Sequence, residues 1–158
     1  MTEAYLDYQL VEGYIHNWLL AGPLTISIPN TGEIKEDLEE RKLEIVAQFH
    51  SPELEFQDPP VERANFKVGE TELSWRYVHC ADDHFVATST KNPTWSYVRH
   101  WAHTRIQTSA EQAVNLGLTT LGPADVWLNG EHIHRQEVFS DQEPQTSSFP
   151  TSLKQGDN

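Results

Sequence analysis

The histidines and the single cysteine are the side chains in this sequence best suited to holding a transition metal. Eight histidines are present, and the densest group of possible ligands lies at residues 79–84, with two histidines, one cysteine and two aspartates. His132 and His134 are two residues apart, so in a β-strand both lie on one face and can reach a single ion. A complete site needs further ligands that the sequence does not identify. We therefore expect the histidines to be surface residues without a metal.

The sequence lacks the common catalytic motifs. It contains no Gly-x-Ser-x-Gly, phosphate-binding loop, Gly-x-Gly-x-x-Gly or His-Glu-x-x-His pattern. His79 and Cys80 place a base beside a nucleophile, but adjacent residues of a strand point to opposite sides. With 24 Asp and Glu residues, a pair of carboxylates at glycosidase spacing arises by chance. We expect Cys80 to be a buried, unreactive thiol, and we predict that the chain alone is not an enzyme.

Residues 95–106 place aromatic and cationic side chains on one parity of a predicted strand. This set is Trp95, Tyr97, Arg99, Trp101, His103 and Arg105, and the other parity holds Val98, Ala102, Thr104 and Ile106. If the second set faces the core, the first forms an exposed row of the kind that interfaces enrich. The row is a ligand surface, a contact with a neighbouring domain, or tryptophan packing under an insertion. For a carbohydrate ligand, whose rings stack on aromatic side chains, the candidates are Trp95, Tyr97, Arg99 and Trp101.

The composition is that of one soluble globular domain. The chain has 158 residues, with 11 Lys and Arg against 24 Asp and Glu, and a net charge of −13 with neutral histidines. Such a surface repels phosphate backbones and anionic lipids, so we expect neither nucleic acid nor a membrane as a partner. No signal peptide and no membrane-length apolar run is visible. A single cysteine excludes an internal disulfide and favours a reducing, cytoplasmic location.

Most of the sequence has the alternation and turn signals of short strands. Gly22-Pro23 is expected to end the first strand, and Asn129-Gly130 to form a two-residue hairpin turn. Residues 35–49 have the spacing of an amphipathic helix, and the Pro-rich residues 51–69 are expected to be a loop. Together these elements predict a mainly β fold, a sandwich or barrel with one helix attached. The predicted strands cover residues 14–21, 24–28, 72–78, 84–90, 95–108, 113–120, 124–128 and 131–135.

Four segments carry a resemblance to a known family. Residues 125–131, Asp-Val-Trp-Leu-Asn-Gly-Glu, resemble the hairpin of galactose-binding-like jelly-roll domains, which occur in β-galactosidases, β-glucuronidases and similar accessory modules. Residues 18–24 are similar to the opening Trp-hydrophobic-x-Gly-Pro strand of that family. Residues 97–108, followed by residues 113–118, are similar to its paired core strands, and residues 153–158 to its Leu-Lys-x-Gly-x-Asn turn.

The resemblance implies a jelly-roll β-sandwich over residues 1–158. The helix lies in an insertion near 33–50, because residues 32–70 depart from the minimal jelly roll. In this family the turn at 153–158 leads into one more apolar strand. We therefore expect the chain to be the N-terminal part of a longer protein, with an open sheet edge that permits edge-strand dimers of the isolated chain.

The resemblance implies architecture more directly than activity, because many such domains bind no sugar. We expect a non-catalytic accessory module that binds carbohydrate or braces a catalytic domain in a larger carbohydrate-active enzyme, such as a glycoside hydrolase. The partner is then a glycan or a neighbouring domain of the same polypeptide. One alternative is a structural interaction domain without a ligand, and another is a stand-alone hydrolase or lyase.

A structural calcium ion occurs in some members of the family. Asp82 and Asp83, or Asp141 with Glu143, would supply the oxygen ligands that calcium prefers. No segment has the regular spacing of a calcium-loop motif, and an acidic, solvated loop is the alternative. No other cofactor is expected.

Overall fold

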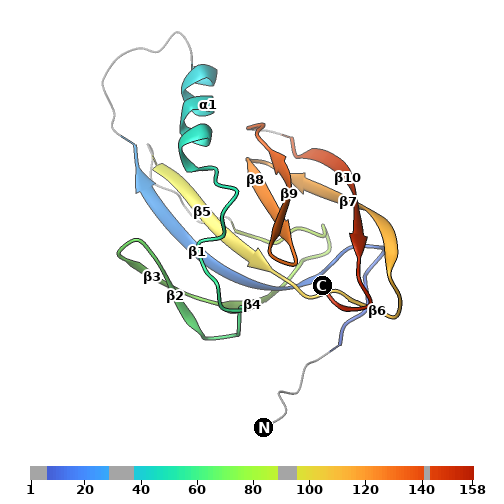
Figure 1. The fold of residues 1–158 in the computed structure, drawn as a ribbon. Helices are drawn as coiled ribbons and strands as arrows, with labels where there is room; N and C mark the ends of the chain where they lie inside the picture. Colours follow the sequence, from blue (N-terminus) through green and yellow to red (C-terminus); the bar gives the residue numbers. More distant parts are fainter. Residues whose placement is uncertain (1–6, 29–37, 89–95, 141–142) are drawn as a thin grey trace. The chain divides into compact units, whose positions relative to one another are not determined.

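The computed structural model describes residues 7–28, 38–88, 96–140 and 143–158 (Figure 1). Within these ranges the chain forms eleven strands and one helix, so the prediction of a mainly β fold is confirmed. The jelly-roll arrangement of the strands and the single domain over 1–158 stay predictions. No helix of the described ranges is long and apolar enough to cross a membrane.

The chain divides into two compact units, each built from two separate stretches of sequence. Unit 1 comprises residues 1–31 and 55–104, and unit 2 comprises residues 32–54 and 105–158. The strands of unit 1 are β1 (Asn17–Ser27), β2 (Asn65–Val68), β3 (Thr71–Ser74), β4 (Arg76–His79) and β5 (Ser96–His103). Unit 2 contains α1 (Leu38–Phe49), β6 (Gln107–Thr108), β7 (Gln112–Thr120), β8 (Ala124–Leu128), β9 (Glu131–Gln136), β10 (Gln145–Leu153) and β11 (Gly156–Asp157).

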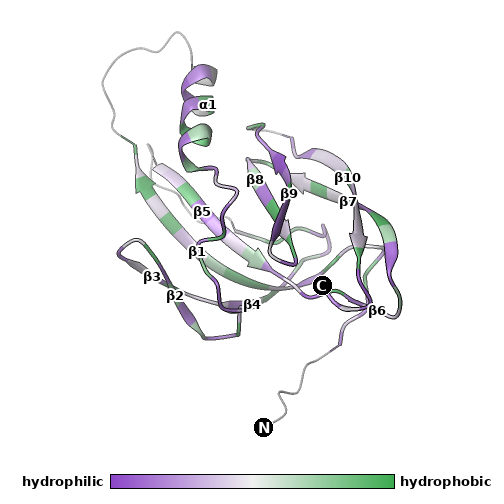
Figure 2. Ribbon diagram, in the orientation of Figure 1, coloured by the Kyte–Doolittle hydropathy of each residue, from purple (hydrophilic) through white to green (hydrophobic). Residues whose placement is uncertain are grey.

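Unit 1 is organised around a three-stranded antiparallel sheet in the order β4-β1-β5. In the second half of β1 the hydrophobic residues Leu24 and Ile26 alternate with Thr25 and Ser27, and the two hydrophobic residues are the less exposed (Figure 2). Leu20 and Ala21 of β1 are fully buried. Because adjacent residues of a strand point to opposite faces, both faces of the sheet are covered at this point of β1.

Gly22-Pro23 does not end the first strand, contrary to the prediction of two strands at 14–21 and 24–28. β1 continues through this pair to Ser27, with a register shift between Ala21 and Leu24 against β5. Gly22 has a φ of 111°, and a Cβ placed on it would lie 2.8 Å from the carbonyl oxygen of Arg99. Only glycine permits both this backbone conformation and so close an approach of the neighbouring strand.

The segment before β4 also differs from the sequence prediction. Residues 65–68, expected to be loop, form β2 and pair with β3, whereas the strand expected over 72–78 is interrupted at Trp75. The backbone of Trp75 instead bonds to residues 63 and 64: its N–H donates to Ala64 O at 3.0 Å and its carbonyl accepts from Arg63 N at 2.8 Å. This detour turns the indole into the unit. Residues 84–88 of the strand expected at 84–90 are not in a strand, and residues 89–90 lie outside the described ranges.

An aromatic cluster forms the packed face of unit 1. The Trp75 ring stacks on Phe66 with centroids 5.0 Å apart and meets Phe56 edge-on at 5.3 Å. Trp101 of β5 meets Phe66 edge-on at 5.9 Å, and His103 lies 6.4 Å from Trp75. Trp75 is 3% exposed. Large rings in offset and edge-on contacts provide much of the apolar burial in this unit.

Unit 2 consists of three antiparallel strand pairs and the helix. β7 pairs with β10 over nine residues, β8 with β9, and β6 with β11. Asn129 and Gly130 have φ of 53° and 83°, so the predicted hairpin turn between β8 and β9 is confirmed. β10 was not predicted, because its Ser- and Thr-rich sequence with Pro150 lacks apolar alternation. The helix predicted over 35–49 is confirmed from residue 38, and residues 35–37 lie outside the described ranges.

The chain turn at 153–158 is closed by the side chain of Asn158. Its Oδ1 accepts from the backbone N–H of Lys154 at 2.9 Å, and its Nδ2 donates to the carbonyls of Lys154 and Gly156 at 2.9 and 3.1 Å. The backbone of Asn158 also exchanges two hydrogen bonds with Ile106. These contacts explain why an asparagine ends this turn.

Candidate functional site

The candidate ligand residues of β5 are only partly free. Trp95 lies outside the described residues, whereas Tyr97, Arg99 and Trp101 share β5. Arg99 Nη2 lies 2.8 Å from Glu55 Oε1, and its guanidinium lies 4.9 Å from the centroid of the Trp101 ring. Trp101 is half-buried against Phe66. Of the three interpretations of the row, tryptophan packing fits Trp101. Arg99 is engaged in an ion pair within unit 1.

Asp82 and Asp83 are exposed residues of the loop that follows β4. Asp83 Oδ1 accepts a hydrogen bond from the backbone N–H of Phe85 at 3.0 Å, which stabilises the local turn. In the described ranges no group of three or more His, Cys, Asp or Glu side chains is placed to hold a metal ion. Calcium at Asp82 and Asp83 therefore stays a prediction, and Asp141 lies outside the described residues.

Cys80 is buried beside the first strand. Its Sγ–H donates to the carbonyl of Ile15 at 3.7 Å, and burial raises the pKa of the Cys80 thiol. His79 is exposed, so the prediction that these neighbours point to opposite sides is confirmed. A thiol with a raised pKa holds little thiolate at neutral pH and is a poor nucleophile.

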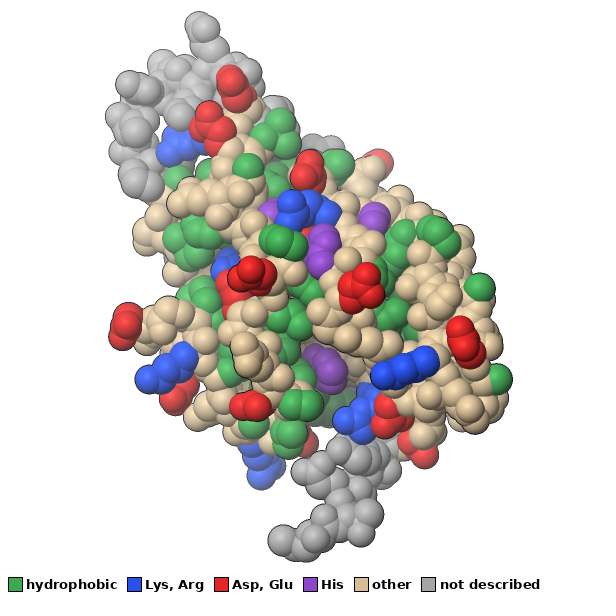
Figure 3. Space-filling model, in the orientation of Figure 1, with side chains coloured by type: hydrophobic (Ala, Val, Ile, Leu, Met, Phe, Trp, Pro, Cys, Tyr) green, Lys and Arg blue, Asp and Glu red, His purple; other side chains and the backbone are tan. Residues whose placement is uncertain are grey.

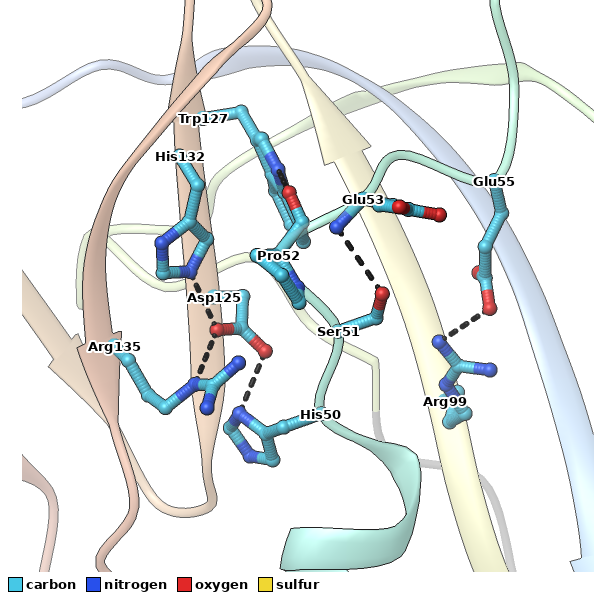
Figure 4. A network of polar contacts seen from close by, with 10 residues as sticks. All are labelled: His50, Ser51, Pro52, Glu53, Glu55, Arg99, Asp125, Trp127, His132 and Arg135. Atoms are coloured by element: carbon cyan, nitrogen blue, oxygen red, sulfur yellow. Dashed lines mark hydrogen bonds and ion pairs between the residues drawn. The ribbon is translucent and has the colours of Figure 1, made fainter.

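The carboxylate of Asp125 on β8 has three charged or titratable partners in unit 2. His132 Nε2 lies 2.7 Å and Arg135 Nε 2.8 Å from Asp125 Oδ1, and His50 Nδ1 lies 2.6 Å from Oδ2. Figure 4 shows the three side chains converging on this carboxylate from β9 and from the end of α1. The side chain of Asp125 is 10% exposed and that of His50 is 5% exposed. We call these four residues the Asp125 cluster.

The three partners of Asp125 are not equivalent. His132 and Arg135 make hydrogen bonds to Oδ1, whereas the His50 contact is within ion-pair distance without hydrogen-bond geometry. Burial lowers the pKa of His50, and the Asp125 carboxylate opposes this shift. The two effects on the pKa of His50 therefore oppose each other, and burial is the larger.

A bulge in the hairpin explains the arrangement of its histidines. Val126 pairs with His134 and Trp127 with His132, which leaves Ile133 without an opposite residue. His132 is therefore directed to Asp125, whereas His134 Nε2 bonds Ser147 Oγ at 2.8 Å and stacks on Phe149. The two histidines therefore have different partners, and the possibility that both reach one ion is not realised, because alternation breaks at the bulge.

Trp127 anchors the hairpin to the segment that follows α1. Its indole N–H donates to the carbonyl of Pro52 at 2.9 Å, and its ring meets His132 edge-on at 5.3 Å (Figure 4). The side chain therefore links the hairpin to this segment. Neither the role of Asp125 nor its link to His50 was predicted, because the two lie 75 positions apart in the sequence. The only signal of this cluster in the sequence was the pattern of charged residues in β8 and β9.

A group of exposed rings in unit 1 was also missed. Tyr8 stacks on Tyr77 of β4 with centroids 6.3 Å apart, and Tyr14 stacks on His84 at 4.1 Å. His79 lies two residues after Tyr77 on the same face of β4. The three tyrosines are 52%, 51% and 43% exposed for Tyr8, Tyr14 and Tyr77. We call these five residues the tyrosine–histidine strip.

The strip is fixed by polar contacts behind it. His16, which is buried, places Nε2 2.7 Å from His84 Nδ1, and Glu12 Oε2 lies 3.3 Å from His84 Nε2. When His84 donates from Nε2 to Glu12, its Nδ1 accepts from His16. Tyr77 donates its hydroxyl proton to Asn17 Oδ1. The rings of His84 and Tyr77 are therefore held in place by polar contacts within unit 1.

Comparison with known proteins identifies no relative. No protein-family model, no curated protein and no solved structure matches the chain. The function is therefore argued from the side chains themselves.

Proposed function

We propose that this chain is a non-catalytic accessory module that binds a neutral carbohydrate. In this proposal it is a galactose-binding-like jelly-roll domain from the N-terminal part of a larger carbohydrate-active enzyme, and it presents a glycan to a neighbouring domain. The Trp-x-Asn-Gly hairpin at residues 127–130 and the Asn-closed turn at 153–158 support this class.

The Asp125 cluster carries the non-catalytic part of the proposal. A general base or nucleophile needs a lone pair directed at substrate. Asp125 is almost fully buried, and both of its oxygens already contact His50, His132 or Arg135. This network thus links β8, β9 and the residue that follows α1. This use of charged groups suits a structural scaffold better than a reaction centre.

The second candidate is an interaction domain without a ligand. Leu10, Leu121 and Val138 are more than half exposed, and large exposed apolar side chains occur at protein interfaces. Figure 3 shows hydrophobic side chains at the surface among charged and histidine side chains. A docking role predicts binding to a protein domain and no response to any sugar.

The decisive experiment measures binding and turnover on the same samples. The chain is run in native gels that contain neutral or acidic polysaccharides, and the same mixtures are assayed for released reducing ends. The proposal predicts retarded migration with at least one neutral polysaccharide and no released ends. Release of reducing ends would show an enzyme, and unchanged migration in every gel would favour the docking candidate.

A further inference from the structure

In unit 1, the rings of Tyr8 and Tyr14 are more exposed than the ring of Trp101 on β5. Tyr8 and Tyr14 are each about half exposed; the ring of His84 covers one face of Tyr14, and Tyr8 lies nearly parallel to Tyr77 with centroids 6.3 Å apart. The outer faces of such rings are the surfaces on which the C–H groups of a pyranose pack. By contrast, Trp101 is half-buried against Phe66 and is covered in part by Arg99.

The strip also has hydrogen-bonding groups beside the rings. His79 is an exposed imidazole on the same strand face as Tyr77, and the hydroxyl of Tyr77 is oriented by Asn17. Glu12 presents a carboxylate next to His84. Hydroxyl groups of a sugar both donate and accept, so imidazole, phenol and carboxylate groups at a ring edge complement them.

The rings of Tyr14 and His84 are held in a fixed geometry before binding. Val11 and Tyr14 exchange two backbone hydrogen bonds, of 3.0 and 2.8 Å, which close the turn that carries Tyr14. His84, on which Tyr14 stacks, is bonded to buried His16. A platform that is already ordered loses little conformational entropy on binding, so a weakly interacting ligand is bound at lower cost.

The negative charge around the strip limits the class of ligand that can bind there. Glu12, Asp82 and Asp83 are exposed acidic residues on the strip or on the loop next to it, and the whole chain has a net charge of −13. An acidic polysaccharide is repelled by this surface, whereas an uncharged sugar is not. A neutral glycan is therefore the ligand that fits both the rings and the charge.

We propose that the tyrosine–histidine strip, rather than the β5 row, is the platform on which this chain binds a neutral glycan. This inference rests on the proposed carbohydrate-binding function and assigns its site. Tyr14 and Tyr8 stack on successive sugar rings, and His79 and Glu12 contact hydroxyl groups.

The test compares the variants Tyr14→Ala and Tyr8→Ala with wild type. All three proteins are titrated with the neutral polysaccharide that most retards the wild-type chain in native gels. Each variant is expected to bind about two- to tenfold more weakly, the loss that one aromatic contact of about 0.5–1.5 kcal/mol represents. Val61→Ala removes a side chain of similar exposure, 47%, elsewhere in unit 1 and is the matched control. Circular dichroism confirms that each variant keeps the wild-type fold.

The outcomes separate the site from the function. Weaker binding in both tyrosine variants, with Val61→Ala unchanged, supports the inference. Unchanged binding in both tyrosine variants, with a loss in Trp101→Phe, overturns the strip as the site and leaves the carbohydrate-binding function standing. If wild type binds no neutral polysaccharide, both the site and the function are overturned.

Discussion

At the residue scale, Asp125 shows how a charged side chain serves the interior of this chain. Its carboxylate is almost fully removed from water and is stabilised by His132, Arg135 and the close approach of His50. A buried carboxylate is tolerated only when such partners replace its hydration. The cluster is therefore sensitive to the loss of any one member.

Asp125→Asn tests this dependence. The substitution keeps the shape of the side chain but leaves Arg135 and the two histidines without their anion, so the free energy of unfolding should fall by about 2 kcal/mol. Urea unfolding followed by circular dichroism measures the change. Asp157→Asn is the control, because this exposed carboxylate lies 3.6 Å from Arg105 and its loss should cost less than about 0.5 kcal/mol. Equal effects of the two substitutions would contradict the structural role of Asp125.

Gly22→Ala tests the crossing of β1 past β5. Alanine at a φ of 111° is strained, and its Cβ would lie 2.8 Å from the carbonyl oxygen of Arg99. We expect a loss of about 2 kcal/mol or more in the free energy of unfolding. Gly122→Ala, where an added Cβ meets nothing within 4 Å, should change it by less than about 0.5 kcal/mol. A Gly22→Ala variant as stable as wild type would rule out the close approach.

His100 makes the stability of the chain depend on pH. Burial, and to a smaller extent the positive charge of Arg76, lower the pKa of His100 from its ordinary value of 6.5. The folded state therefore binds fewer protons at His100 than the unfolded state. The contribution of the neutral side chain is complete above pH 6.5 and is lost as the pH falls through that value toward the lower folded pKa.

The substitution His100→Gln removes this titration. Urea midpoints at about pH 7.5 and about pH 5.5 should therefore differ less in the variant than in wild type. A variant whose midpoint falls with pH as steeply as wild type would show that other groups cause the acid sensitivity.

At the element scale, the β8–β9 hairpin is held through one indole hydrogen bond to the segment after α1. Trp127→Phe keeps an aromatic ring but removes the N–H that bonds Pro52, so the free energy of unfolding should fall by about 1 kcal/mol. Hydrogen exchange of the β8 and β9 amides should become faster in the variant. Val138→Ala, at an exposed position just after β9, is the control and should leave that exchange unchanged. If the β8 and β9 amides of Trp127→Phe exchanged as slowly as those of wild type, this hydrogen bond would not hold the hairpin.

The elements that follow local rules were predictable from the sequence. The Asn129-Gly130 turn, the helix and β7 are each specified by nearby residues, and the structure has all three. The errors arise where tertiary contacts override local signals. β1 runs through Gly22-Pro23 because it pairs with β5, and Pro150 is tolerated in β10 because that strand pairs with β7.

The sites were harder to predict than the elements. Asp125 and His50 meet only through folding, and a pattern of alternation cannot reveal a bulge such as the one at Val126 and Trp127. The row on β5 was recognised by parity, but parity does not show whether Phe66 or solvent faces Trp101. Tyr8 and Tyr77 are distant in sequence, so their stacking had no sequence signal.

At the scale of the whole molecule, net charge limits the ligands. With a charge of −13, the chain should migrate unretarded through gels that contain an acidic polysaccharide at low salt. Its retardation by a neutral polysaccharide should be the same at low and at high salt, because no ion pair forms with the ligand. Retardation by an acidic polysaccharide that disappears with added salt would contradict the assignment of a neutral glycan.

The central claim is that unit 1 binds a neutral glycan on exposed tyrosine rings and that the chain performs no chemistry on it. The most direct test is a nuclear magnetic resonance titration of the wild-type chain with a neutral oligosaccharide from the polysaccharide that binds. The account predicts progressive shifts of the ring resonances of Tyr8, Tyr14 and Tyr77. It also predicts that the oligosaccharide remains uncleaved, so that no new sugar signals appear. Shifts confined to other residues, or the appearance of cleaved sugar, would contradict it.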